Sequence, residues 1–327
     1  SALMTQKPFH LPPQASAFDA ALAMTERHIA HVCLVENGRL AGVVSERDLF
    51  SLQRVDLVHL ARTIRHAGKV ETLAALRSDI RLLVERMLAH GASSTQITQL
   101  ITLLNDHTVC RVIELCIEEL GDPGVPFSWL CFGSEGRREQ TLHTDQDNGI
   151  LFDAESSQEA EVIRQRLLPL ARRINQQLAQ CGFSLCPGNI MAGNPELCLS
   201  RSEWARRFSS FVREASPESL LGSSIYFDLR VIWGDEDGGE HLRQQLFTEI
   251  QDNNLFQRML AANALQHRPP VGRFRDFVVA RSGAEKHTLD LKTEGLTPFV
   301  DGARLLALVH GVADCNTQRR FTELVEK

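Results

Sequence analysis

The residues best suited to chemistry lie close together in the segment CFGSEGRREQTLHTDQDNGILFD, positions 131–153. A pair of carboxylates, Asp145 and Asp147, follows a small-residue turn at Gly133 and Ser134. Alternate side chains of a strand point to the same face, so the spacing predicts that the two carboxylates project together. Two carboxylates held so close repel each other unless a cation lies between them, and oxygen ligands of this kind suit Mg²⁺ or Mn²⁺. We therefore expect a divalent metal here.

The turn before the two carboxylates predicts phosphate binding. Glycine lets backbone N–H groups approach a phosphate closely, and a following helix would direct its positive end to the same place. Arg137 and Arg138 add positive charge beside the turn. The Gly-Lys-Ser/Thr sequence of a Walker P-loop does not follow, so we expect a different kind of phosphate-binding turn.

A third acid, Asp228, lies within SSIYFDLRVIWGD, positions 223–235, which the pattern predicts to be a strand. In that strand Asp228 would share a face with Tyr226 and Arg230, opposite a row of apolar side chains. An acid among apolar residues is costly to bury unpaired. Asp228 is therefore expected to bind either a metal or a cationic partner.

The elements that must position these residues alternate between strand and helix. Strands are predicted at residues 127–132 and 148–153, with a further strand pair within 183–192. Ser-x-x-Glu pairs, which commonly cap helices, predict one long helix after Ser156 and another after Ser200. The three acids are thus expected beside a small sheet with flanking helices.

Helical periodicity dominates much of the remaining chain. Residues 57–120 are predicted to be helical with a break at HGASS, positions 90–94, and the chain is predicted to be helical from about residue 239 onward. Residues 8–52 are predicted to form a helix, two strands joined by a turn at Gly38, and a second helix. These patterns predict four parts, at residues 1–56, 57–120, 121–238 and 239–327.

The segment HVCLVENGRLAGVVSERDLF, positions 31–50, resembles the second half of a CBS motif. The resemblance implies that Ser45 and Asp48 contact the ribose and phosphate of an adenine nucleotide. The alternative is that these residues cap a helix, where an acid in the first turn is favourable. CBS motifs normally act in pairs, so a single copy implies either a piece of a longer protein or a homodimer with an isologous interface.

The run GSEGRREQTLHTDQDN, positions 133–148, resembles the nucleotidyltransferases found downstream of CBS or cyclic-nucleotide-binding domains. These are relatives of the protein-PII uridylyltransferase within the DNA polymerase beta type superfamily. The resemblance continues through CPGNIMAGNP, FDLR, LDLKTEGLTPFVDGARLLAL and NTQRR, and so covers most of the chain after Leu60. It implies an α+β fold with a single CBS motif, a helical connector, a polymerase-beta-like sheet and a C-terminal helical domain.

The same resemblance implies a role for each residue of the predicted site. Gly133 and Ser134 would hold the β- and γ-phosphates of a nucleoside triphosphate, and the Asp-x-Asp pair would bind Mg²⁺ or Mn²⁺. Asp228 would complete a second metal site and help to activate the attacking hydroxyl, while Arg137 would offset developing charge. The implied reaction moves a nucleoside monophosphate to a hydroxyl on an acceptor protein, under control of an adenine nucleotide at the CBS module.

Simpler interpretations compete with this reaction. The Asp-x-Asp pair could be solvated loop acids, and Asp228 could form an ion pair with Arg230. A second functional hypothesis is a non-catalytic module for signal transduction that senses nucleotides without turnover. The intact set of three aspartates favours the enzyme.

Composition excludes or disfavours several other functions. The net charge of −6, with both signs mixed along the chain, disfavours a nucleic-acid partner. We find neither a run of apolar residues long enough to span a membrane nor a signal-peptide pattern, so we expect a cytoplasmic protein without a membrane partner. The eight cysteines lack CxxC spacing and are expected to be reduced, buried thiols.

Overall fold

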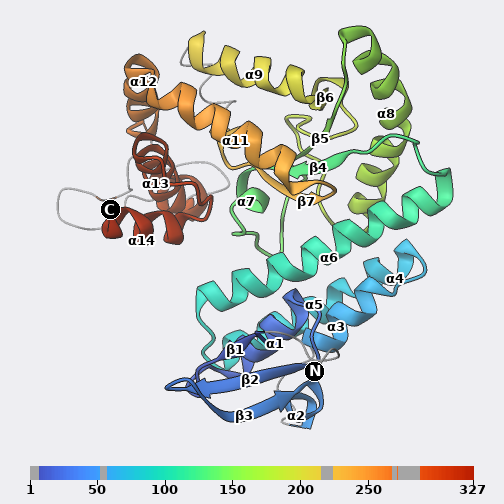
Figure 1. Ribbon diagram of the computed structural model, residues 1–327, viewed down its shortest axis with the longest axis vertical. Coiled ribbons are helices and arrows are strands. Elements are labelled where there is room, and N and C mark those ends of the chain that lie inside the picture. The colour runs from blue at the N-terminus through green and yellow to red at the C-terminus, as the bar shows by residue number, and fades with distance from the viewer. Residues whose placement is uncertain (1–6, 52–56, 215–223, 267–270, 272–287) are drawn as a thin grey trace. The chain divides into compact units, whose positions relative to one another are not determined.

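A computed structural model describes residues 7–51, 57–214, 224–266, 271 and 288–327 (Figure 1). The chain divides into two compact units, each of which is described by itself. The first unit comprises residues 1–122, 140–145 and 173–185, and the second comprises 123–139, 146–172 and 186–327. The predicted sheet and the C-terminal helices thus belong to one unit.

The N-terminal module of the first unit contains the predicted helix, two strands and second helix in that order, preceded by a short strand, β1, that was not predicted. It consists of β1 (His10–Leu11), α1 (Ala17–Glu26), β2 (His31–Glu36), β3 (Arg39–Ser45) and α2 (Glu46–Ser51). The sheet order is β1-β2-β3, with β1 parallel and β3 antiparallel to β2. Asn37 and Gly38 both have positive φ, at 51° and 74°, which suits the tight turn of a two-residue hairpin.

Four helices complete the described part of the first unit up to residue 120: α3 (Leu57–Arg65), α4 (Val70–Ala75), α5 (Arg77–Ala89) and α6 (Ser94–Leu120). The predicted break at residues 90–94 is confirmed, because Gly91 has a φ of 78° and Ser93 forms a capping box with Gln96 that starts α6. The interruptions on either side of α4 were not predicted. Along the rest of the region, α3 and α5 pack on α6.

The second unit contains a four-stranded sheet of order β6-β5-β4-β7 (Figure 1). Its strands are β4 (Ser128–Cys131), β5 (Asn148–Phe152), β6 (Cys198–Ser200) and β7 (Arg230–Trp233). β4 is antiparallel to both β5 and β7, while β6 runs parallel to β5. β4 and β5 confirm two predicted strands, whereas β6 was not predicted.

One strand prediction was wrong and another was only partly confirmed. Within 183–192 there is no strand pair, and the only β-type pairing recorded there is an isolated bridge between Ser184 and Asp145. Of the predicted strand at 223–235, the described residues 224–235 form a strand only at β7, because Ser224–Phe227 forms the 3₁₀ helix η2. A continuous apolar run does not distinguish a strand from a buried helical turn by its period.

Helices cover the sheet of the second unit and form its C-terminal part. They are α7 (Gly133–Gly136), the first part of α8 (Ser157–Gln180), α9 (Arg201–Arg213), α11 (Glu236–Gln251), α12 (Asn254–Ala264), the π-helix η3 (Leu291–Leu296), α13 (Thr297–His310) and α14 (Thr317–Glu326). The predicted caps are confirmed, since Ser200 forms a capping box with Glu203, and Ser156 accepts a hydrogen bond from the N–H of Glu159.

The core of the second unit joins the sheet to these helices. Trp204 is fully buried, and its Nε1–H donates to the Ile150 carbonyl at 2.8 Å. Phe132 lies against Trp204, with ring centroids 5.7 Å apart.

The eight cysteines are free thiols and most are buried, as predicted. None of the helices described for this chain is both long and apolar enough to cross a membrane.

Candidate functional site

The predicted phosphate-binding turn is α7, which directly follows β4. Gly133 has a φ of 57°, a conformation that favours glycine. A Cβ added there would lie 3.0 Å from Cγ1 of Ile225 and 3.3 Å from Oδ2 of Asp147. The Phe132 N–H also donates to the Asp147 carbonyl at 2.9 Å. The Asp147 carboxylate therefore lies directly against the glycine of the turn.

The other end of the turn packs against Asp228. A Cβ added to Gly136 would lie only 1.7 Å from the backbone oxygen of Asp228, so no larger residue fits without a backbone shift. Arg230, two residues further along, donates from Nη2 to the Glu135 carbonyl at 3.1 Å. The four-residue turn is thus held between two of the three predicted aspartates.

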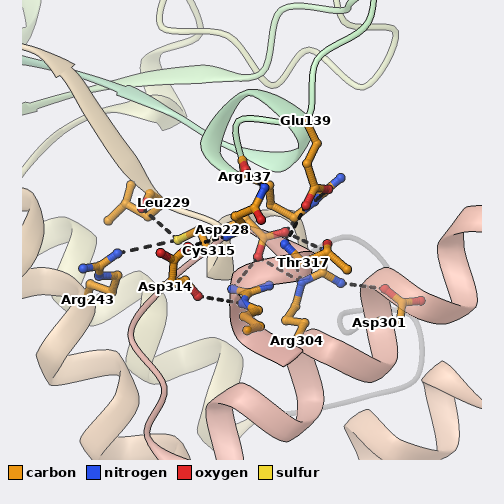
Figure 2. A network of polar contacts seen from close by, with 12 residues as sticks. Arg137, Glu139, Asp228, Leu229, Arg243, Asp301, Arg304, Asp314, Cys315 and Thr317 are labelled. Carbon is orange, nitrogen blue, oxygen red and sulfur yellow. Dashed lines mark hydrogen bonds and ion pairs between the residues drawn. The ribbon is translucent and has the colours of Figure 1, made fainter. Parts of the chain in front are cut away.

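Asp228 is fully buried and is surrounded by arginines (Figure 2). Its Oδ2 accepts hydrogen bonds from Nη1 of Arg137 and Nη2 of Arg304, each at 2.7 Å. Nε of Arg304 lies 3.2 Å from the same oxygen and 3.3 Å from Oδ1. Nη2 of Arg320 lies 2.8 Å from Oδ1 as an ion pair rather than as an aligned hydrogen bond.

These charges stabilise the ionised form of Asp228. Burial by itself would raise its pKa, but the charges of Arg304, Arg320 and Arg137 outweigh burial and lower the pKa below its usual range. Burial likewise opposes the charged form of Arg304, and Asp228 more than compensates, so the pKa of Arg304 is raised. The carboxylate of Asp228 and the guanidinium of Arg304 therefore each stabilise the charged form of the other.

Further acids and backbone groups extend the network to α13 and α14. Nε of Arg137 lies 2.9 Å from Oε2 of Glu139, whose Oε1 accepts from the Thr317 N–H at 2.6 Å. Arg304 forms a second ion pair with Asp301 at 2.6 Å. The side chain of Asn316 donates to the Arg137 carbonyl at 3.1 Å. Figure 2 shows Arg137, Glu139, Thr317 and Arg304 gathered between the turn and the C-terminal helices.

The structure corrects the sequence-based placement of Asp228. The residue lies between η2 and β7 rather than within a strand. The expectation of a cationic partner is confirmed, and three of the partners are Arg137, Arg304 and Arg320. Both carboxylate oxygens are contacted by guanidinium groups, and the side chain is shielded from solvent.

The Asp-x-Asp pair lies where the chain passes from one unit to the other, with Asp145 in the first and Asp147 in the second. Asp145 is exposed, Gln146 is buried and Asp147 is half-buried, and both aspartates precede β5 rather than lying within a strand. Among the residues that the structure describes, no three His, Cys, Asp or Glu side chains lie close enough together to hold a metal ion. The metal site at these two aspartates therefore stays a prediction.

The sequence did not single out Cys186 as a neighbour of the site. Burial raises the pKa of the Cys186 thiol, and its hydrogen bond with the Asp147 carboxylate raises the pKa further. The residue opens the CPGN turn, in which the Asn189 N–H donates to the Cys186 carbonyl at 2.9 Å. A second link fixes this segment beside β5, where Oδ1 of Asn148 accepts from the Ala192 N–H at 2.8 Å.

Arg304 and Arg320 were also not predicted as site residues, although they lie in the C-terminal motifs LDLKTEGLTPFVDGARLLAL and NTQRR. Their exposed fractions are only 6% and 0%. Arginine is seldom buried without an acidic partner, but nothing in a helical sequence says which arginine will be buried.

Ser134, which was predicted to bind phosphate, is half-buried, and its carbonyl accepts from the Glu139 N–H at 2.9 Å.

The two residues predicted to bind nucleotide in the N-terminal module form a helix cap. Oγ of Ser45 donates to Oδ2 of Asp48 at 2.6 Å and accepts from the Asp48 N–H at 3.2 Å. The hydrogen bond from the Ser45 side chain is the main cause of a lowered pKa at Asp48. The capping alternative is therefore present in the structure, and nucleotide binding by these residues stays a prediction.

Comparison with known families assigns a domain to most of the chain. Residues 1–54 match the CBS domain, residues 78–218 match the family described as "Putative nucleotidyltransferase DUF294", and residues 254–327 match "Putative nucleotidyltransferase substrate binding domain". No curated protein matches the chain. The order of the three matches is the one that the sequence motifs implied. Asp228 lies between the second and third matched segments.

Proposed function

Because the chain joins a CBS domain to a nucleotidyltransferase domain and its substrate-binding domain, we propose that it transfers a nucleoside monophosphate to a hydroxyl on an acceptor protein. The hydroxyl oxygen attacks the α-phosphorus of a nucleoside triphosphate. The bond between the α-phosphorus and the bridging oxygen breaks, and pyrophosphate leaves while the hydroxyl proton is released to base or solvent.

The contact between the Gly133 turn and the Asp147 carboxylate carries this proposal. The Cβ position of Gly133, which glycine leaves empty, lies 3.3 Å from Oδ2 of Asp147. A phosphate seated on the turn would therefore lie near a carboxylate, an arrangement that is unfavourable unless a cation lies between them. This is the environment that Mg²⁺ or Mn²⁺ favours when it takes substrate phosphates as part of its ligand set.

The residues of the chain would divide the work as follows. Asp145 and Asp147 would hold the metal, which when bound neutralises charge on the triphosphate. Gly133 and Ser134 would receive the β- and γ-phosphates, the former through its backbone. Arg137 supplies a positive charge directly after the turn, and its guanidinium is held in place by Asp228 and Glu139.

The CBS domain would regulate this activity by binding an adenine nucleotide near Ser45 and Asp48. Pairing of two copies into a homodimer would supply the partner that a single CBS motif lacks. Leu40 and Val43 of β3 support this proposal, because their exposed fractions of 65% and 51% leave apolar surface uncovered. Calorimetric titration with AMP of wild type and of Asp48→Asn tests the regulatory part.

Transfer of a labelled α-phosphate to protein, with pyrophosphate release measured in parallel, tests the catalytic part. Each of the four triphosphates is supplied with Mg²⁺ or Mn²⁺, using cell lysate as the source of acceptors. Asp147→Asn should abolish both signals. Asp153→Asn is the matched control, because Asp153 forms a solvent-exposed ion pair with Arg201 outside the turn. Full transfer by Asp147→Asn would contradict the proposal, as would no transfer by wild type under any condition.

A second candidate function is a nucleotide sensor without turnover. The observation that favours it is the full burial of Asp228, whose oxygens are occupied by arginines. A sensor would show a metal-dependent rise in melting temperature with triphosphate but release no pyrophosphate. The enzyme would show both, so the two measurements together separate the functions.

A further inference from the structure

We propose that Asp228 is a positioning residue, not a metal ligand, and that it couples the C-terminal substrate-binding domain to the phosphate-binding turn through Arg137. The part of this proposal that concerns nucleotide affinity rests on the proposed function. The part that concerns domain coupling rests on the contacts alone.

The three arginines around Asp228 come from three different places in the fold. Arg137 directly follows the turn α7, Arg304 lies in α13, and Arg320 lies in α14. Arg137 falls within the segment matched to the nucleotidyltransferase family, and the other two fall within the segment matched to its substrate-binding domain. Asp228 belongs to neither segment. One carboxylate therefore joins residues from both domains.

The carboxylate has no capacity left for a metal ion in this arrangement. Five contacts of 3.3 Å or less reach its two oxygens from guanidinium nitrogens, whereas a carboxylate offers about four lone-pair sites. The side chain has no solvent-exposed area. A metal would have to displace Arg304 or Arg320 and leave a buried guanidinium without its partner, which is strongly unfavourable.

Arg137 receives its position from the same network. Nη1 is held by Asp228 and Nε by Glu139, and Glu139 in turn accepts the N–H of Thr317 at the start of α14. The Arg137 carbonyl accepts from Asn316, the residue that caps α14. Both the side chain and the backbone of Arg137 are thus tied to the C-terminal helices. A displacement of α13 or α14 would therefore move Arg137, which directly follows the turn.

The backbone next to Asp228 supports the same role. Gly136 packs so closely on the Asp228 carbonyl that a single added carbon would overlap it. Arg230 binds the Glu135 carbonyl from the strand that follows Asp228. The backbone of Asp228 and the side chain of Arg230 therefore both contact the end of the turn.

A metal titration separates a positioning role from a ligand role. Binding of Mn²⁺ in the presence of each triphosphate is followed by electron paramagnetic resonance for wild type, Asp147→Asn and Asp228→Asn. We expect Asp147→Asn to lose bound Mn²⁺ and Asp228→Asn to keep the stoichiometry of wild type. Loss of Mn²⁺ from Asp228→Asn equal to that from Asp147→Asn would overturn the proposal.

A double-mutant cycle tests whether Asp228 acts through Arg137. Asp228→Asn should weaken triphosphate binding about tenfold, the scale of one hydrogen bond to a charged group. Arg137→Ala should have an effect of similar size, and the double variant should bind no more weakly than Arg137→Ala alone. Asp228→Glu should restore part of the affinity. Additive losses would show that Asp228 does not act through Arg137 and would overturn that part of the proposal.

Hydrogen exchange gives a readout that does not depend on nucleotide, so it stays informative if the proposed function fails. In Asp228→Asn, amides of α7, α13 and α14 should exchange at least about tenfold faster than in wild type, and by a larger factor than those of α9, which lies in the same unit but outside the network. If this variant does not fold, Arg304→Lys, which keeps the charge but loses the fork geometry, should show the same pattern more weakly. Unchanged exchange in all three elements would overturn the coupling.

Discussion

Replacing Asp228 by Asn removes the negative charge at the centre of a buried network and is expected to destabilise the second unit strongly. The side chain of Asp228 is fully buried, and those of Arg320, Arg304 and Arg137 have exposed fractions of 0%, 7% and 13%. Solvent therefore screens these interactions very little. The substitution keeps the shape of the side chain, so the effect reports on charge and hydrogen bonding rather than on packing.

The size of the stability loss follows from how the substitution leaves the arginines around position 228. Breaking a buried ion pair by removing one partner costs about 3–5 kcal/mol, because the remaining charge stays buried without compensation. Asn retains one carbonyl oxygen that can accept from a single guanidinium. We therefore expect a loss of unfolding free energy at the lower end of this range, about 3 kcal/mol. For a unit of this size the melting temperature should fall by roughly 6–12 °C.

Asp153→Asn is the matched control. Asp153 pairs with Arg201 at 2.8 Å, but the exposed fractions of their side chains are 75% and 34%. Exposed pairs of this kind contribute about 0–1 kcal/mol. Urea and thermal unfolding of both variants measure the difference. A loss of stability in Asp228→Asn no larger than that in Asp153→Asn would refute the reasoning from burial.

The pH dependence provides a second check on the same residue. The folded-state pKa of Asp228 is lowered, whereas the unfolded chain protonates near pH 4. The stabilising contribution of the carboxylate is therefore fully present above about pH 5 and is lost as the pH falls below about 4 toward the folded-state pKa. The stability difference between wild type and Asp228→Asn should be constant from pH 5 to 8 and narrow at pH 3.5. A difference that widens in acid would contradict the assigned pKa direction.

Three further predictions concern other parts of the chain. Gly136→Ala should lower the free energy of unfolding by about 3 kcal/mol or more, because its Cβ would overlap the Asp228 carbonyl. Gly302→Ala, which has open space around it in α13, should raise the free energy of unfolding by about 0.5–1 kcal/mol. Equal changes in stability for the two variants would contradict the overlap at Gly136. Ser200→Ala should lower stability by about 1 kcal/mol through loss of the cap of α9, and unaltered urea unfolding would argue against that cap. Light scattering should show a dimer that Val43→Lys dissociates, and a wild-type monomer at micromolar concentration would rule out the proposed CBS pairing.

Much of the local structure could be predicted because its causes lie within a few residues. The capping pair of Ser200 and Glu203 starts α9 through contacts three residues apart, and the Asn37-Gly38 hairpin depends only on positive φ at its two central residues. Strands β4 and β5 coincide with short apolar runs that are bounded by turn residues. The association of a Gly-Ser turn with an Asp-x-Asp pair likewise needs only one segment, and together with the motifs further along the chain it carried the resemblance to the nucleotidyltransferase family that residues 78–218 match.

The sequence by itself determined that Asp228 needs a charged partner, because an acid among apolar residues cannot be buried alone. It did not determine the partners, since Arg137 precedes Asp228 by 91 residues and Arg304 follows it by 76. Nor could apolar alternation reveal that Ser224–Phe227 is a 3₁₀ turn, because four consecutive residues, 226–229, are buried and show no strand-like alternation. An arginine on a helix can remain hydrated or be buried against an acid. Only the packing of α13 and α14 against the turn decided which arginines surround Asp228.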